Sequence, residues 1–209
     1  MQATETREKA TDSPPVDFLP INAVDHIEFW VGNARQAAHY YRSAFGMKLT
    51  AYSGPETGIR DRASYVLEQE KIRFVLTTPL QSDGAIADHI RVHGDGVRDI
   101  ALTVDDAARS YGETTLRGAR GVREPFTLRD DSGEVRLASI AAYGDTVHTF
   151  VERRNYRGPF LPGFRAVDEP DRVSRPAGLK YIDHMVGNVG WRQMNTWVKF
   201  YEDVMGFRL

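Results

Sequence analysis

The 209-residue chain has no cysteine, no long apolar run and no excess of basic residues. Without cysteine it cannot form a disulfide, a thiolate metal site or a thiol nucleophile. No apolar stretch approaches the roughly 20 residues that a membrane helix needs, so we expect no membrane partner. The net charge of −2 provides no basic surface for nucleic acid. Because the N-terminus also lacks the apolar stretch of a signal peptide, we predict a cytoplasmic protein.

One strand-to-helix passage occurs twice in the chain. Residues 24–49 read VDHIEFWVGNARQAAHYYRSAFGMKL, and residues 182–209 read IDHMVGNVGWRQMNTWVKFYEDVMGFRL. A repeat of this length indicates a duplicated module rather than a short solenoid unit. Since the second copy stops just after its first helix, the sequence predicts one whole module followed by the opening of another.

Hydrophobic periodicity predicts two βαβββ units within residues 23–152. Asn33 and either Asp105 or Asp106 are the expected N-caps of the two longer helices, and Gly46 has the position of a helix-ending glycine. The predicted fold class is α+β, with tandem βαβββ modules that form open, barrel-like mixed sheets, the second module being truncated.

Four segments follow from this pattern. We predict a disordered polar arm over residues 1–20, which holds three prolines. The first domain covers residues 21–155, and an Arg-, Pro- and Gly-rich linker over residues 156–178 crosses the surface. Residues 179–209 begin the second domain, with a strand over 180–189 and a helix over 191–205.

His184 is the main candidate for chemistry. On the predicted strand it shares a face with Ile182, Val186 and Asn188, because side chains alternate along a strand. An imidazole on the concave face of a curved sheet can reach a metal ion. The competing interpretation is a core histidine that bonds a neighbour.

His26 is the matching residue of the first copy and shares its predicted face with Val24, Glu28 and Trp30. Its candidate partners are Asp99 and Thr149. One histidine and one aspartate with a threonine make an incomplete site, so we expect a structural His26. The remaining histidines lie outside this face. We predict that His148 is packed in the core and that Glu152, on the same strand, is at the surface. We predict exposed helical faces for His39, His89 and His93.

Three segments carry a resemblance to a known family. They are YIDHMVGNV at 181–189, GDGVRDIA at 94–101 and YRGPFLPGF at 156–164. Together with the tandem βαβββ units they resemble the vicinal-oxygen-chelate superfamily, and within it most closely the 4-hydroxyphenylpyruvate dioxygenase family. The resemblance runs from about residue 20 to the last residue.

This resemblance implies a non-catalytic first domain and a second domain that binds Fe(II) through two histidines and a glutamate. His184 is then the first iron ligand, while Val186 and Asn188 bind substrate. The other ligands would lie at the second-domain counterparts of Asp99 and Thr149, which these 209 residues do not include.

The function implied is an Fe(II)-dependent dioxygenase that converts 4-hydroxyphenylpyruvate and O2 to homogentisate and CO2 in tyrosine catabolism. Both atoms of O2 are incorporated, the small-molecule partners are an aromatic α-keto acid and O2, and the expected assembly is a homo-oligomer. One alternative is a hydroxymandelate synthase acting on the same substrate. The other is a metal-free small-molecule binding protein of the same superfamily, with a ligand cleft inside residues 23–152.

Overall fold

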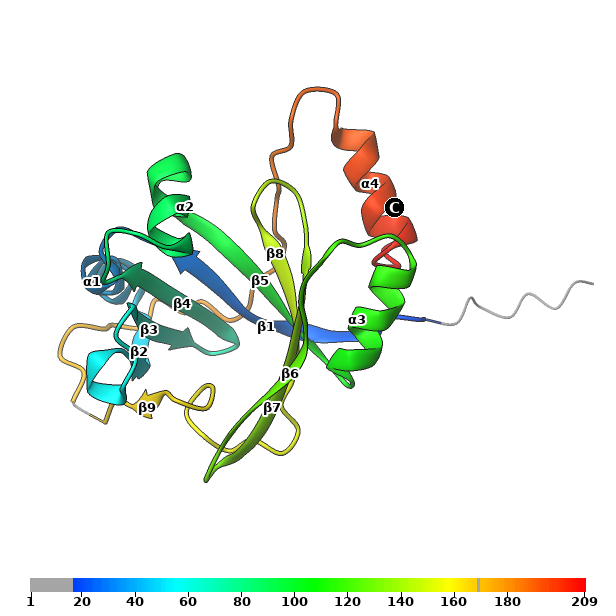
Figure 1. Cartoon of the computed structure of the whole chain (residues 1–209). Coiled ribbons are helices and arrows are strands. Elements are labelled where there is room, and N and C mark those ends of the chain that lie inside the picture. The colour runs from blue at the N-terminus through cyan, green and yellow to red at the C-terminus, as the bar shows by residue number, and fades with distance from the viewer. Residues whose placement is uncertain (1–16, 169) are drawn as a thin grey trace, which may run out of the picture.

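The computed structural model describes residues 17–168 and 170–209, so the arm predicted over residues 1–20 lies outside the described range up to position 16. Within the described ranges, nine strands form one curved sheet in the order β6-β7-β8-β5-β1-β4-β3-β2-β9 (Figure 1). The strands are β1 (Ile21–Trp30), β2 (Lys48–Ser53), β3 (Arg62–Gln69), β4 (Ile72–Pro79), β5 (Gly96–Val104), β6 (Gly121–Asp130), β7 (Gly133–Ala141), β8 (Val147–Glu152) and β9 (Arg165–Ala166).

The helices lie beside this sheet. They are α1 (Ala34–Phe45), α2 (Ala85–His93), α3 (Ala107–Leu116) and α4 (Met194–Asp203), and a short 3-10 turn, η1, covers Pro55–Thr57. Figure 1 shows α1 and α2 beside one half of the sheet and α3 and α4 beside the other. In the described part of the chain, no helix has both the length and the apolar character needed to cross a bilayer.

The two predicted βαβββ units are confirmed. β1 pairs with β4 in parallel, β5 pairs with β8 in parallel, and the two units join through antiparallel pairing of β1 with β5. Each unit thus contributes one half of the sheet, and the first strands of the two units lie next to each other at its centre. The side chains of these two strands on the concave face therefore point into one shared space.

Helix ends follow the sequence signals. The Asn33 side chain accepts a hydrogen bond from the backbone N–H of Gln36 at 3.0 Å, and the Asp106 side chain accepts one from the backbone N–H of Arg109 at 2.9 Å. Each cap satisfies a backbone donor that has no partner within the helix. Gly46 ends α1 with φ at 69°, a left-handed conformation that glycine adopts without steric cost.

A β-bulge in β1 changes which residues face the concave side. Val24 is paired with Leu102, and His26 is paired with Ala101, the adjacent residue of β5. β1 therefore contains one extra residue at this point, which is a β-bulge. Val24 therefore packs with the helix-side core cluster and not beside His26. The predicted common face of His26, Glu28 and Trp30 is confirmed, and the inclusion of Val24 in it was wrong.

The segment predicted as a surface linker is partly internal. Phe160 is only 2% exposed and packs against Ala51, Val66 and Val75 of the sheet. Farther along, β9 extends the sheet by pairing with β2. Hydrophobic burial thus draws this Pro- and Gly-rich segment onto the open side of the sheet.

The strand predicted over residues 180–189 is absent, because residues 177–190 have no regular secondary structure. This segment is anchored to the β3–β4 hairpin by single hydrogen bonds: the Lys71 N–H donates to the Lys180 carbonyl, and the Leu179 N–H donates to the Gln69 side chain. A strand needs a laterally paired neighbour, and in the described residues none pairs with this segment. The predicted helix is present but shorter, as α4.

Candidate functional site

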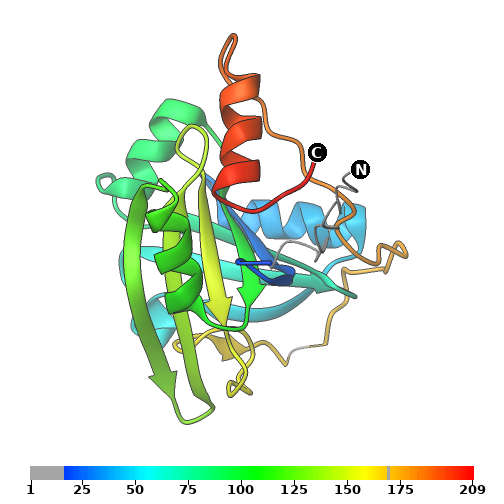
Figure 2. The same ribbon diagram turned by 90° about the vertical axis from the view of Figure 1, so that its right-hand side faces the viewer.

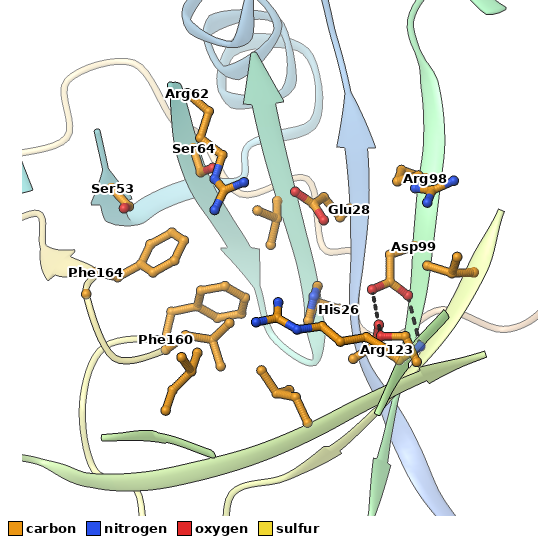
Figure 3. A pocket seen from close by; sticks show the side chains of 18 of the residues that line it. His26, Glu28, Ser53, Arg62, Ser64, Arg98, Asp99, Arg123, Phe160 and Phe164 are labelled. Atoms are coloured by element: carbon orange, nitrogen blue, oxygen red, sulfur yellow. Dashed lines mark hydrogen bonds between the residues drawn. The ribbon is translucent and has the colours of Figure 1, made fainter. Parts of the chain in front are cut away.

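The curved sheet holds a cavity of ≈ 480 Å³ on its concave side. His26, Glu28 and Trp30 from β1 line it together with Asp99 from β5 and Thr149 from β8. Phe160 lies beside His26, and Phe164 lies on the side of the cavity away from Asp99 (Figure 3). The candidate partners Asp99 and Thr149 thus line the same cavity as His26, but the hydrogen bond of His26 is to Asp25.

Asp99 is fully committed to Thr149. The Thr149 backbone N–H donates to Oδ1 of Asp99 at 3.0 Å, and the Thr149 hydroxyl donates to Oδ2 (dashed lines in Figure 3). Burial raises the pKa of Asp99 to about 6, although the charge of His26 and the bonds from Thr149 act in the opposite direction. Since each carboxylate oxygen accepts a hydrogen bond from Thr149, a cation at Asp99 would compete with these donors.

His26 is fixed by its neighbour in sequence. Its Nδ1 lies 2.7 Å from Oδ1 of Asp25, and its ring meets Phe160 edge-on at a centroid distance of 5.0 Å. Arg153 binds the same carboxylate with two nitrogens, at 2.6 and 2.8 Å. Burial alone would raise the pKa of Asp25, but His26 and Arg153 together hold it well below its usual range. The result is a buried, charge-compensated cluster.

Glu28 is held in a similar way. The Thr77 hydroxyl donates to Oε1 of Glu28 at 2.6 Å, and Thr77 also shares a hydrogen bond with Ser64. Arg62, Arg98 and Arg123 add positive charge around the cavity (Figure 3). Each acidic group beside His26 thus has a hydrogen-bond donor, and the rim is cationic. These hydrogen bonds and charges disfavour a metal ion at His26, the residue expected to be structural.

The three residues predicted to hold iron and substrate lie elsewhere, on the irregular segment before α4. Both the His184 and Asp183 side chains are 76% exposed, and Val186 and Asn188 are exposed as well. Nδ1 of His184 lies 2.8 Å from Oδ2 of Asp183, which leaves Nε2 for a metal ion. A carboxylate on the other ring nitrogen is the usual support of a metal-binding histidine, so the residue is chemically suited to ligation.

Helix α4 packs on the first module. Figure 2 shows α4, in red, beside β8. His148, near the start of β8, forms a hydrogen bond with the Tyr201 hydroxyl at 2.9 Å, and the Trp197 ring meets Tyr143 edge-on. Val204 and Met205 are buried in the same core cluster as β1 and β5. The prediction of a packed His148 is confirmed, and its burial lowers the pKa of the ring. The aromatic face of α4 is half-buried, whereas Trp191 before it is 94% exposed.

One further cluster was missed by sequence reasoning. Among the described residues, the only group of three histidine, aspartate or glutamate ligands with atoms close enough to hold a metal ion is His89, His93 and Asp145. The four-residue spacing of the two histidines on a predicted helix was the available signal, because it places them on one face. Asp145 could not be found this way, since only the tertiary structure brings it to α2.

Comparisons with known proteins agree with this fold. Residues 23–141 match the family model of the Glyoxalase/Bleomycin resistance protein/Dioxygenase superfamily. The chain is 47% identical over 188 residues to 4-hydroxyphenylpyruvate dioxygenase from Dictyostelium discoideum, covering 88% of this chain and 51% of that protein. For the enzyme of the same name from Pyricularia oryzae, the identity is 42% over 211 residues, covering 91% and 50%. The chain thus spans about half the length of the curated relatives it matches.

Solved structures show the same architecture. A triple mutant of 4-hydroxymandelate synthase from Streptomyces coelicolor superposes with a TM-score of 0.76 at 24% identity, covering 90% of this chain and 53% of that one. Methylmalonyl-CoA epimerase from Mycobacterium tuberculosis gives a TM-score of 0.52 at 21% identity, covering 63% and 88%. At these identities the likeness establishes the fold alone. Because the family model matches more than half of the residues of this chain, the chain belongs to the Glyoxalase/Bleomycin resistance protein/Dioxygenase superfamily.

Proposed function

We propose that this chain is part of an Fe(II)-dependent 4-hydroxyphenylpyruvate dioxygenase, which converts 4-hydroxyphenylpyruvate and O2 to homogentisate and CO2 in tyrosine catabolism. The observation that carries the proposal is the 47% identity to the Dictyostelium enzyme across 88% of this chain. The activity is a property of the whole protein, because the chain covers only 51% of that relative. We further propose a cytoplasmic homo-oligomer whose small-molecule partners are the aromatic α-keto acid and O2.

The two modules have different roles in this proposal. Residues 21–155 form a non-catalytic domain, residues 156–178 link the domains, and residues 179–209 begin the iron-binding domain. The hydrogen bonding of the first cavity supports this division, because Asp99 and Glu28 are both engaged by threonine side chains. An ion placed there would have to displace those donors and face a cationic rim.

His184 is the proposed first iron ligand. The carboxylate of Asp183 holds the Nδ1 proton, fixes the tautomer and directs the Nε2 lone pair outward. Val186 and Asn188 follow closely enough in the chain to line the substrate pocket. Fe(II) held by two imidazoles and one carboxylate would supply coordination positions for the α-keto acid and for O2, and hence the oxidative chemistry.

A second candidate function has one observation in its favour. The ≈ 480 Å³ cavity lies within the first module and has the size of a small-molecule site. A metal-free binding protein would use this cavity and would not need His184. Its cationic rim would select an anionic ligand, and the proposed α-keto acid substrate is also an anion. Ligand binding alone therefore does not distinguish the two functions, whereas iron content and oxygen consumption do.

The test uses the protein that carries this chain. Iron content, oxygen uptake with 4-hydroxyphenylpyruvate and product identity are measured for the wild type, for His184→Ala and for His39→Ala, a control at another exposed histidine. We expect iron-dependent formation of homogentisate, its loss in His184→Ala and its retention in the control. Normal turnover by His184→Ala would remove the ligand assignment. A hydroxymandelate product would reassign the enzyme, and substrate binding without iron or oxygen uptake would favour the binding protein.

A further inference from the structure

A cluster of potential metal ligands lies outside both sites described above. His89 and His93 are one turn apart on α2, and Asp145 is in the loop between β7 and β8, on the same end of the sheet as α2 (Figure 1). Their ligand atoms all lie within 4.8 Å of one another. The two imidazole centroids are 4.5 Å apart, and Nε2 of His93 lies 2.7 Å from Oδ2 of Asp145. An ion between these atoms would bridge two elements that are distant in sequence.

The surroundings hold this arrangement in place before any ion binds. Trp30 meets the His89 ring edge-on at 5.1 Å, and the Arg98 guanidinium lies 4.7 Å from the centroid of the same indole. Arg98 also donates to the main-chain carbonyl of Asp145. The loop is closed by a backbone hydrogen bond from Ala142 to Thr146 at 2.9 Å. Little further ordering is needed for coordination, which favours binding.

From this geometry we propose that His89, His93 and Asp145 bind one divalent transition-metal ion, such as Zn²⁺, Co²⁺ or Ni²⁺. Two imidazole nitrogens and one carboxylate oxygen suit these metals, whereas Mg²⁺ and Ca²⁺ prefer sites made of oxygen ligands. The nearby Arg98 opposes any cation electrostatically, so affinity depends on the bonds to the two imidazole nitrogens and the Asp145 carboxylate. The ion would tie α2 to the β7–β8 loop and leave at least one coordination position to water.

The three ligands differ in exposure. His89 is half-buried beside Trp30, and a neutral imidazole is the form that binds a metal ion. His93 is exposed and pairs with Asp145, which is also exposed. An ordinary surface ion pair between those two residues is the competing interpretation, and it assigns no role to His89.

The test separates this site from the proposed iron site. Apo protein carrying His184→Ala is titrated with Zn²⁺ and Co²⁺ by calorimetry and by the visible absorption of Co²⁺. We expect one ion per chain, a loss of affinity of at least about tenfold when His93→Ala or His89→Gln is added, and no change with His39→Ala. Mg²⁺ should give no signal. Far-ultraviolet circular dichroism verifies that each variant is folded.

Two outcomes would overturn the proposal. One is an absence of Zn²⁺ and Co²⁺ binding in the His184→Ala protein, which would leave only an ion pair on the surface. The other is undiminished affinity after removal of both His89 and His93. Neither result bears on iron at His184, which is measured separately, so the two proposals can fail independently.

Discussion

The two Asp-His pairs of this chain make the same local contact in opposite environments. In each pair the Nδ1 atom of the histidine bonds the aspartate that precedes it, at 2.7 Å for His26 and 2.8 Å for His184. The His26 and Asp25 side chains are 7% and 3% exposed, whereas both side chains of the second pair are 76% exposed. The dipeptide sets the hydrogen bond, and the surroundings decide what the histidine can do.

The difference lies in what covers each pair. Arg153 and Phe160, both beyond the last strand of the first module, enclose Asp25 and His26. In the described residues, no arginine and no aromatic ring makes an equivalent contact with His184. The Arg153 guanidinium compensates the charge of Asp25, so the first pair contributes to the stability of the fold, whereas the second pair remains exposed.

The largest expected contrast is in iron binding. In the protein that carries this chain, His26→Ala should leave iron content unchanged, because its neighbours Asp99 and Glu28 are already hydrogen-bonded. His184→Ala should remove the iron. Metal analysis of the two folded variants provides the comparison. An equal loss of iron in both would contradict the division into a non-catalytic first module and an iron-binding second module.

The next contrast is in stability. Asp25→Ala leaves the partly buried Arg153 guanidinium without its carboxylate partner and should reduce the free energy of unfolding by about 3 kcal/mol. Asp183→Ala removes an exposed side chain and should change it by less than about 0.5 kcal/mol. Urea denaturation of both variants measures the difference. Similar effects from the two substitutions would contradict the role assigned to Arg153.

The Asp25 contribution should depend on pH. Its pKa in the folded state is depressed, so its stabilisation is complete above the unfolded pKa of about 3.9 and decreases as the pH falls below that value. The difference in unfolding free energy between wild type and Asp25→Ala should therefore shrink on acidification below about pH 4.

Asp99 should show the opposite pH dependence. Its pKa is raised to about 6 in the folded protein, so stability is highest when it is protonated and decreases as the pH rises from about 4 towards 6. Asp99→Asn keeps an acceptor and a donor for Thr149 but carries no charge. The variant should be more stable than wild type by on the order of 2 to 3 kcal/mol at pH 8 and similar to it at pH 4. A constant difference across this range, measured by urea denaturation, would contradict the assignment.

The smallest contrast concerns the glycines that end the matching helices. Gly46 and Gly206 have φ angles of 69° and 72°, so alanine is strained at both, at roughly 1 kcal/mol. A Cβ at Gly46 would lie 2.0 Å from the Arg175 carbonyl oxygen, whereas at Gly206 the nearest atom is Cζ of the Phe18 ring, at 3.1 Å. Gly46→Ala should therefore reduce the melting temperature more than Gly206→Ala. The reverse order would indicate that the Arg175 segment moves easily.

Local signals predicted most of the first module correctly. Asn33, Gly46 and Asp106 end or begin their helices as expected, because capping depends on residues three or four apart. The common face of His26, Glu28 and Trp30 also follows from alternation along one strand. Val24 departs from it, since the bulge arises from pairing with β5, which lies far away in the sequence.

The errors fall where a distant segment decides the outcome. Residues 180–189 have the composition of a strand, but in the described residues they have no strand beside them with which to form a ladder. Phe160 lies in a Pro- and Gly-rich segment that looks like a surface linker, yet it is buried because the open side of the sheet exposes apolar residues. The His89, His93 and Asp145 cluster depends on a loop that the helical spacing of the histidines cannot reveal.

The amino-acid sequence by itself determined the helix caps and the contact within each Asp-His pair, because these depend on residues within about one helical turn. Only the tertiary structure decided that the first pair is buried under Arg153 and Phe160, that the second is exposed, and that Asp145 meets two histidines of α2. Burial and charge compensation are set by segments that approach from more than a hundred residues away, and these determine whether an imidazole supports the fold or is free to bind.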